Sequence, residues 1–156
     1  MKNSTWSGRF KKGIDEEVLE FTESISIDHL LFDCDIKVCI AHAEMLSECK
    51  IITNKESKLL IKGLKQVKDK YDNGKLSLLT KYEDVHMNIE QALIKEIGEV
   101  GKKIHMGRSR NDLVATDFRL YLRECSDLIL NKIRDTRYAL ALSANKYSHT
   151  IFPGYT

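Results

Sequence analysis

The stretch from about Asn111 to about His149 contains neither glycine nor proline, and this feature constrains the fold more than any other. Apolar residues recur within it at helical spacing, namely Phe118, Leu122, Cys125, Ile129 and Ile133, widened by Leu120, Leu128, Leu130 and Leu140. Such a pattern predicts one helix that spans roughly 50–60 Å at a rise of about 1.5 Å per residue. Because apolar residues cover much of the circumference of this helix, it needs other helices beside it. We therefore expect a bundle that later residues, other subunits or both complete.

The residues before this stretch also predict helices. Pro153 is the only proline, and no Asn-Gly or Asp-Gly turn separates alternating apolar runs. Helical spacing of apolar residues covers about 15–22, 29–50, 54–72 and 85–97. We predict an all-α fold in which residues 1–109 form a small N-terminal helical domain that begins with an extended arm. Residues 110–156 are expected to form the first long helix, and a turn, of a central helical bundle that is truncated at its end.

Capping residues predict where these helices begin and end. A polar break at residues 23–28 precedes the second helix, and we expect Ser26 or Asp28 to cap it. The apolar face of that helix is expected to hold Leu31, Cys34, Val38, Ala41 and Met45. Thr53 and Glu56 have the spacing of a capping box for the third helix. Asp84 is expected to cap the fourth helix, which Gly98 and Gly101 end.

Composition narrows the class of protein. Hydrophobic residues make up 42% of the chain and charged residues 31%, which suits a folded, water-soluble domain. The net charge of +2, without a basic stripe, argues against a nucleic-acid partner. No window approaches the roughly 18–20 apolar residues of a membrane span. The N-terminal sequence lacks the apolar core of a secretory signal, so we expect a cytoplasmic protein.

The four cysteines form no Cys-x-x-Cys pair. Cys39 and His42 are three residues apart and have the spacing of two metal ligands on one helix face. No second pair completes a set of four ligands, so we predict no metal site and reduced thiols that fill gaps between helices.

Hydrogen-bond donors are concentrated in the sequence HMGRSRND, residues 105–112, where the long helix begins. The first turn of a helix leaves backbone N–H groups without partners and favours negative charge. Arg108 and Arg110 add forked guanidinium groups, and Ser109 and Asn111 add further donors. The cluster is suited to a small anion, most naturally a carboxylate. The alternative is that these residues, with Asp112 as a cap or as an arginine partner, only begin a helix and face water.

Four short motifs occur in one order: WSGRF at residues 6–10, YEDVH at 82–86, GRSRND at 107–112 and PGYT at 153–156. Together they resemble the N-terminal third of the argininosuccinate lyase family, within the fumarase/aspartase superfamily. The resemblance runs from Trp6 to Thr156. Two residues depart from the family pattern, because Ser7 stands where glycine is usual and Met106 where a small residue is usual.

The resemblance implies a reaction and its partners. Family members cleave argininosuccinate reversibly to arginine and fumarate, with no metal or organic cofactor. A base removes a proton beside a carboxylate, and an acid helps the guanidinium group to leave. Members assemble as homotetramers in which three subunits build each site. The proton-transfer residues are expected after Thr156, so the chain alone is expected to be inactive, with no catalytic residue of its own.

The resemblance also assigns residue roles. Ser24, Asp28, Arg110, Asn111 and Thr156 match substrate-binding positions of the family. His86, Arg108 and Ser109 match supporting positions, with His86 placed to position or stabilise charge rather than to remove a proton. Without the resemblance, the preferred interpretation of Ser24 is a helix-end or turn serine, and a cap of the second helix explains Asp28 equally well.

Two other functions stay open at this point. A crystallin-like structural protein of the same family needs only the helical scaffold and no chemistry. A sibling lyase releases fumarate from a different amino-succinate. Binding of nucleic acid through Arg108 and Arg110 is disfavoured by the near-neutral charge.

Overall fold

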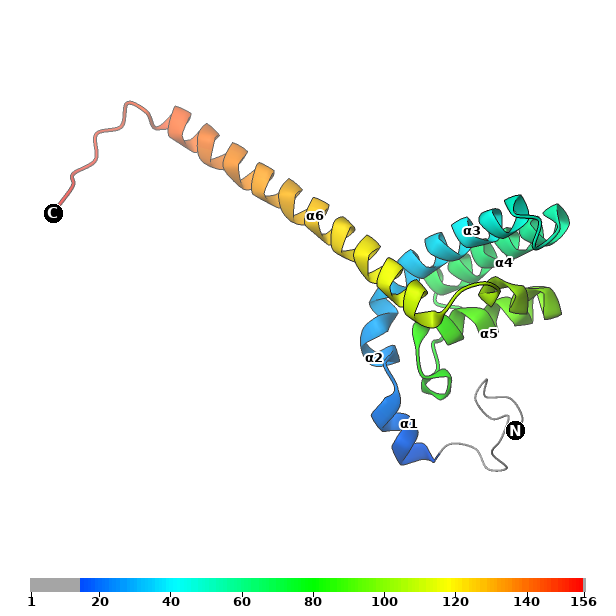
Figure 1. The fold of residues 1–156 in the computed structure, drawn as a ribbon. Coiled ribbons are helices and arrows are strands. Elements are labelled where there is room, and N and C mark those ends of the chain that lie inside the picture. The colour runs from blue at the N-terminus through cyan, green and yellow to red at the C-terminus, as the bar shows by residue number, and fades with distance from the viewer. Residues whose placement is uncertain (1–14, 156) are drawn as a thin grey trace. The chain divides into compact units, whose positions relative to one another are not determined.

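The computed structural model describes residues 15–155. The predicted N-terminal arm with Trp6 and Ser7, and also Thr156, lie outside the described residues. Every regular element within 15–155 is a helix, which confirms the predicted all-α class (Figure 1). The chain divides into two compact units, residues 1–118 and 119–156.

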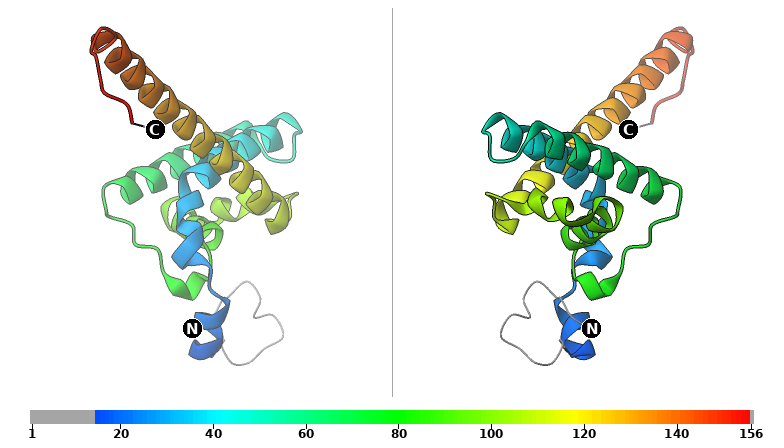
Figure 2. Two further views of the ribbon diagram at one scale, coloured as in Figure 1. Left: turned by 90° about the vertical axis from the view of Figure 1, so that its left-hand side faces the viewer. Right: turned by 90° about the vertical axis from the view of Figure 1, so that its right-hand side faces the viewer.

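The elements follow one another closely along the first unit. They are α1 (Glu16–Thr22), α2 (Ile25–Asp28), η2 (His29–Leu31), α3 (Phe32–Glu48), α4 (Asn54–Asp72), η3 (Thr80–Tyr82), α5 (Val85–Ile97), η4 (Gly98–His105) and α6 (Arg110–Lys146), where η marks a 3-10 helix. Helix α4 packs against both α3 and α5, and η4 folds back on α5 (Figure 2). Only the first turns of α6 belong to this unit.

The core of the first unit lies where α3, α4 and α5 meet. Its largest fully buried apolar side chains are Phe32, Leu46, Leu60, Leu64, Ile89 and Leu93. The ring of Phe32 stacks on that of Tyr71, with 3.8 Å between the ring centroids. This stacking fixes the start of α3 against the end of α4, and α3 supplies several residues of the site described below.

The predicted apolar face of α3 is partly wrong. Ala41 and Met45 are exposed, whereas Asp35, Cys39 and Ala43 are buried. Two apolar stripes overlap on this helix, and the buried one includes a carboxylate. A charged residue at Asp35 made that stripe look like the solvent-facing one, although a partner on another helix permits its burial.

The prediction of a polar break at residues 23–28 is also wrong, because α2 and η2 lie there and continue almost directly into α3. Neither Ser26 nor Asp28 caps α3, whose N-cap is Leu31 without a side-chain hydrogen bond. The preceding 3-10 turn already supplies carbonyl acceptors to the first N–H groups of α3, so no side-chain cap is needed. The carboxylate of Asp28 is therefore left for a different helix.

Other predicted boundaries are confirmed. Thr53 and Glu56 form the capping box of α4, and Asp84 caps α5 by accepting from the Met87 N–H at 2.7 Å. Gly98 ends α5 with φ of +73°, a conformation that favours glycine. All four cysteines are free thiols, as predicted.

Helix α4 approaches α5 closely at Gly63. A Cβ atom added there comes within 2.7 Å of Leu93 Cδ1 and 2.8 Å of Ile97 Cγ2. We predict that Gly63→Ala lowers the free energy of unfolding by about 1–2 kcal/mol, since overpacking outweighs the gain of up to about 1 kcal/mol in helix propensity. Urea unfolding measures the change. Lys65→Ala, on the exposed side of α4, is the control and is expected to change stability by less than about 0.5 kcal/mol. An unchanged or raised stability of Gly63→Ala would contradict the close packing.

The predicted long helix is confirmed as α6, which has 37 residues. Its apolar stripe beyond Phe118 is largely exposed: Leu122, Leu128, Ile129, Leu130, Ile133 and Leu140 each keep about half or more of their surface accessible. None of the described helices is both long and apolar enough to cross a membrane.

Candidate functional site

The site is built around the N-terminus of α5, where the chain makes a tight turn. The Asp84 N–H donates to the Tyr82 carbonyl at 2.7 Å, and Glu83 between them has φ of 65° and ψ of −53°. These values describe a γ-turn of the rare, strained form. The turn aims the Glu83 carbonyl away from α5, toward the start of α2.

That carbonyl holds the segment before α2 in place. It accepts hydrogen bonds from the Ser24 N–H at 2.9 Å and from the Ile25 N–H at 3.0 Å. Two donors on one strained carbonyl offset part of the cost of the turn. As a result, Ser24 and Asp28 lie beside the first turn of α5, although nearly sixty residues of sequence separate them.

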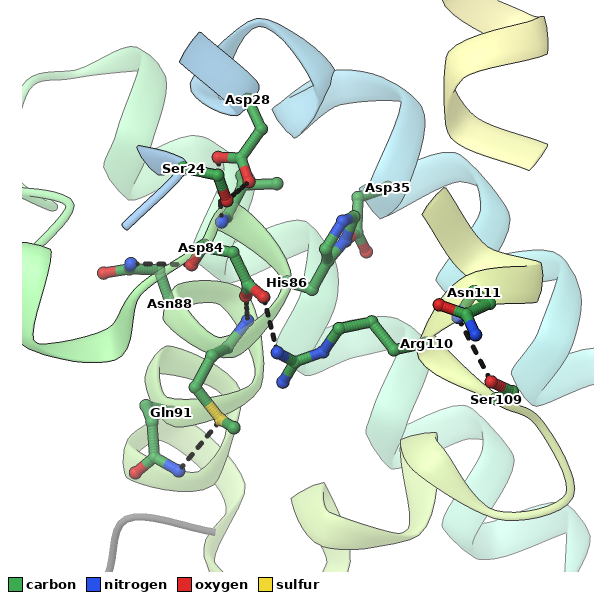
Figure 3. Close-up of polar contacts among 12 residues, drawn as sticks. Ser24, Asp28, Asp35, Asp84, His86, Asn88, Gln91, Ser109, Arg110 and Asn111 are labelled. Atoms are coloured by element: carbon green, nitrogen blue, oxygen red, sulfur yellow. Dashed lines mark hydrogen bonds and ion pairs between the residues drawn. The ribbon is translucent and has the colours of Figure 1, made fainter. Parts of the chain in front are cut away.

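Ser24 and Asp28 form a short hydrogen-bonded chain that ends on α5 (Figure 3). The Ser24 hydroxyl donates to Asp28 Oδ2 at 2.6 Å, and Asp28 Oδ1 accepts from the Val85 N–H at 3.1 Å. Partial burial raises the pKa of Asp28, and the two hydrogen bonds oppose that rise. Asp28 therefore caps α5 together with Asp84, so the prediction that it caps the helix following it is wrong.

Arg110 reaches the same helix terminus from α6. Its Nη1 lies 2.6 Å from Asp84 Oδ2, while the other oxygen of Asp84 caps Met87. Figure 3 shows the Arg110 side chain extending across the site toward Asp84. The guanidinium is about one-quarter exposed, so a ligand carboxylate can compete with Asp84 for it.

His86 occupies the first turn of α5 and lies between two acidic residues. Its Nδ1 makes a short hydrogen bond with Asp35 of α3 and lies 3.6 Å from Asp117 Oδ2 of α6. Burial lowers the pKa of His86, but the hydrogen bond to Asp35 and the charges of the nearby carboxylates outweigh it, so the net shift is upward. Burial, and then the charge of Asp35, raise the pKa of Asp117 to about 7.

Arg108 approaches from the loop before α6. Its Nη2 lies 3.0 Å from the Cys39 sulfur, and its Nε and Nη1 are buried without a hydrogen-bond partner among the described residues. The Cys39 thiol donates to Asp35 at 2.9 Å, and burial raises its pKa well above the ordinary value. His42 Nε2 lies 2.8 Å from the Met106 carbonyl oxygen, so Cys39 and His42 have separate partners rather than a shared one.

Ser109, Asn111 and Asp112 instead build the start of α6. The Asn111 N–H donates to the Ser109 hydroxyl at 3.2 Å, and the Ser109 N–H donates to Asp112 at 3.1 Å. Figure 3 shows Ser109 and Asn111 on the opposite side of the helix start from the Arg110–Asp84 pair. Asp112 thus has the predicted role of a helix-start cap.

The structure therefore places the predicted site residues in three groups. Ser24, Asp28, His86 and Arg110 converge on the N-terminus of α5. Arg108 lines a cavity behind it, whereas Ser109 and Asn111 face away. Thr156 lies outside the described residues.

The cavity behind the helix terminus has a volume of about 10 Å³, which is room for one water molecule and not for a dicarboxylate. Its polar lining residues are Asp35, Cys39, His86, Glu90, His105, Arg108 and Arg110. Chemically, the arrangement offers cationic donors toward a small anion, and any such ligand has to bind at the outer side near Ser24 and Arg110.

Sequence reasoning missed Asp35 and Asp117, which are the most deeply buried acids of the described chain. Each lies on a helix face whose neighbours one turn away are apolar or buried: Cys39 follows Asp35, and Leu113 precedes Asp117. A lone carboxylate on such a face is the signal that points to a buried partner.

A family model described as "Lyase" matches residues 8–156 of the sequence. The chain belongs to this lyase family. The resemblance deduced from the four motifs is thereby confirmed, and the all-helical fold agrees with it.

Individual relatives share the same name. The argininosuccinate lyase of Staphylococcus carnosus is 44% identical over 100% of this chain and 34% of its own length. The argininosuccinate lyase of Nitrosococcus oceani is 46% identical over 97% of the chain and 32% of its own length. The argininosuccinate lyase of Geobacillus thermodenitrificans is 46% identical over 97% of the chain and 33% of its own length. The chain thus spans about a third of the length of the curated relatives it matches.

Proposed function

We propose that this chain supplies part of the substrate-binding site of an argininosuccinate lyase, which cleaves argininosuccinate to arginine and fumarate in arginine biosynthesis. The observation that carries the proposal is the set of relatives with that name, 43–46% identical over 97–100% of the chain. The convergence of Ser24, Asp28, His86 and Arg110 at one helix terminus supports it, because the family resemblance assigns all four to the substrate site and they are far apart in the sequence.

The geometry suggests how these residues act. Proton removal beside a carboxylate leaves a carbanion whose charge spreads into that carboxylate, so fixed donors around it lower the barrier. Arg110 provides such a donor when a substrate carboxylate takes the place of Asp84. Ser24 can donate to the substrate once its hydroxyl turns from Asp28. Asn111 and Thr156 bind other parts of the substrate, Asp28 lies near the arginine moiety, and Arg108, Ser109 and His86 support the site.

We also propose that residues 1–109 form an N-terminal domain and that α6 enters the central bundle of a homotetramer. The exposed apolar stripe of α6 supports this, since burying it needs partner helices. The protein acts in the cytoplasm on small metabolites, without a cofactor and without contact with nucleic acid or membranes. The general base and acid come from segments that the relatives have and residues 1–156 do not include.

A direct assay tests the proposal. We predict that the full-length gene product releases fumarate from argininosuccinate, measured by the ultraviolet absorbance of fumarate, and that residues 1–156 alone release none above background. Adenylosuccinate, aspartate and malate serve as control substrates and are expected to give no product. Turnover of one of these in place of argininosuccinate would assign the protein to a sibling lyase, and no turnover of any would favour a structural role.

A further inference from the structure

Three buried titratable groups meet below the proposed substrate site, each from a different helix. Asp35 of α3 is 1% exposed, His86 of α5 is 8% exposed and Asp117 of α6 is 0% exposed. His86 Nδ1 is hydrogen-bonded to Asp35 and lies 3.6 Å from Asp117 Oδ2. Neither oxygen of Asp117 has a hydrogen-bond partner among the described residues, so the nearest donor in this trio is the imidazole.

The charge balance of the trio depends on one proton. If His86 were neutral and both acids ionised, two negative charges would lie in a nearly water-free site with Arg108 as the nearby cation, which is unfavourable. A proton on His86 places a positive charge beside both carboxylates, and its Nδ1–H donates to Asp35. The upward shift of the His86 pKa and the pKa of about 7 for Asp117 agree with a proton held within this trio near neutral pH.

Other charged groups face the trio from the surrounding elements. They are Asp28 of α2, Cys39 of α3, Asp84 and Glu90 at α5, His105 of η4, Arg108 of the loop and Arg110 of α6. Arg110 is already paired with Asp84, and Arg108 donates toward Cys39. Asp35 and Asp117 have the carboxylate oxygens that lie nearest to His86 Nδ1, whereas the charge of Asp84 raises the pKa of His86 more than that of Asp117 does.

A metal ion fits this trio less well than a proton does. The three side chains could each offer one ligand atom, and those atoms lie within 4.8 Å of one another. The Nδ1 of His86 is hydrogen-bonded to Asp35, and a metal ion on Nδ1 has to displace the proton of that bond. Arg108, with two buried nitrogens lacking partners nearby, adds positive charge that repels a cation.

We propose that Asp117, together with Asp35, is a positioning residue that keeps His86 protonated at neutral pH and fixes its Nδ1 between two carboxylates. Because His86 is only 8% exposed, its charge acts on a ligand anion through the field that it adds at the helix terminus rather than by direct contact. No hydrogen bond of Nε2 occurs within the described residues. The protonation of His86 is a property of this chain alone. The effect of the His86 charge on a substrate carboxylate rests on the proposed function.

Nitrogen-15 NMR of residues 1–156 tests the proton state without any substrate, because imidazole and imidazolium nitrogens have different shifts. We expect both ring nitrogens of His86 to show the protonated pattern at pH 7. A neutral His86 at pH 7 in the unaltered chain overturns the proposal, and this reading needs no variant.

A pair of variants then isolates Asp117. Asp117→Asn keeps the shape of the side chain and removes its charge, and we expect the midpoint of the His86 titration to fall by roughly one pH unit or more. Asp127→Asn, at an exposed position of the same helix, is the matched control and should leave the midpoint unchanged. Equal midpoints in the two variants, with helical content intact by circular dichroism, contradict the assignment.

Two further measurements separate the remaining possibilities. Addition of zinc or manganese is expected to leave the His86 signals unchanged at equimolar metal, and a shift with loss of the Nδ1 proton would overturn the proposal in favour of a metal site. In the full-length protein, Asp117→Asn is expected to shift the alkaline limit of the pH–rate profile for fumarate release downward, which a purely structural role would not do. Absence of any fumarate release refutes the proposed function but leaves the NMR result standing.

Discussion

Replacement of Arg110 by alanine should lower fumarate release from argininosuccinate by the full-length protein by about two to three orders of magnitude. The guanidinium extends from α6 to the helix terminus where Ser24 and Asp28 lie (Figure 3). Its charge is needed most as negative charge grows on a substrate carboxylate, so the loss is expected mainly in kcat. Steady-state kinetics with argininosuccinate provide the measurement.

Two companion variants make that result interpretable. Arg119→Ala removes an exposed arginine from the same helix and is expected to leave turnover within about twofold of the unaltered protein. Arg110→Lys keeps a positive charge beside Asp84 but loses the forked geometry, so an intermediate rate is expected. If Arg110→Ala turned over substrate as fast as Arg119→Ala does, Arg110 would have no place in the substrate site.

Most of the fold could be predicted because its signals are local. The capping box of Thr53 and Glu56, the cap at Asp84 and the stop at Gly98 each depend on residues a few positions apart. The length of α6 follows from the absence of glycine and proline in one stretch. These features are properties of a single helix, and a sequence displays them without knowledge of its neighbours.

The errors occur where a distant partner decides the outcome. Asp28 has the sequence context of a cap for the helix that follows it, yet it accepts from Val85, 57 residues away. The reason is the γ-turn at Glu83, whose carbonyl docks Ser24 and Ile25 and brings Asp28 to α5. A strained turn of this kind leaves no signature in the residue types, so the predicted cap was assigned to the nearest helix.

In the candidate site, too, local motifs predict some residues and contacts between distant helices decide the others. The resemblance supplied Ser24, Asp28, His86 and Arg110, and those residues do converge. Asp35 and Asp117 carry no motif, and their burial depends on the meeting of α3, α5 and α6. Ser109 and Asn111 are predicted as donors to a ligand, and in this structure their backbone N–H groups donate within the first turn of α6, to Asp112 and to the Ser109 hydroxyl.

The trio also makes stability depend on pH in a direction opposite to that of most acidic residues. The pKa of Asp117 is raised from 3.8 to about 7 in the folded chain, so between those values the folded state binds more protons than the unfolded state. Stability therefore falls as pH rises through that window. His86 acts in the same sense: its raised pKa adds stability below its unfolded value of about 6.5, and that stability is lost as pH rises past the folded value.

Asp117→Asn should remove the larger part of the pH dependence of the unfolding free energy. A rise of about 3 units for a fully buried acid costs on the order of 4 kcal/mol once the group must ionise, and an amide never ionises. We predict that Asp117→Asn resembles the unaltered chain in unfolding free energy near pH 4 and exceeds it by one to a few kcal/mol at pH 8. Part of the gain is offset, because His86 loses a counter-ion and the amide needs hydrogen-bond partners. Urea unfolding at a series of pH values measures how the unfolding free energy of each protein changes with pH.

Asp127→Asn again provides the comparison, because this exposed acid is on the same helix and its removal should leave the slope unchanged. A variant at Asp117 that is less stable than the unaltered chain at pH 8, with the original slope, would mean that the carboxylate is ionised and well compensated throughout. The same result would require a stronger cation beside Asp117 than His86 alone, and Arg108, with its buried Nε and Nη1, is the candidate. Stability and NMR titration therefore probe the same carboxyl group in two ways, because urea unfolding reports the cost of ionising Asp117 and the NMR titration reports the effect of its charge on His86.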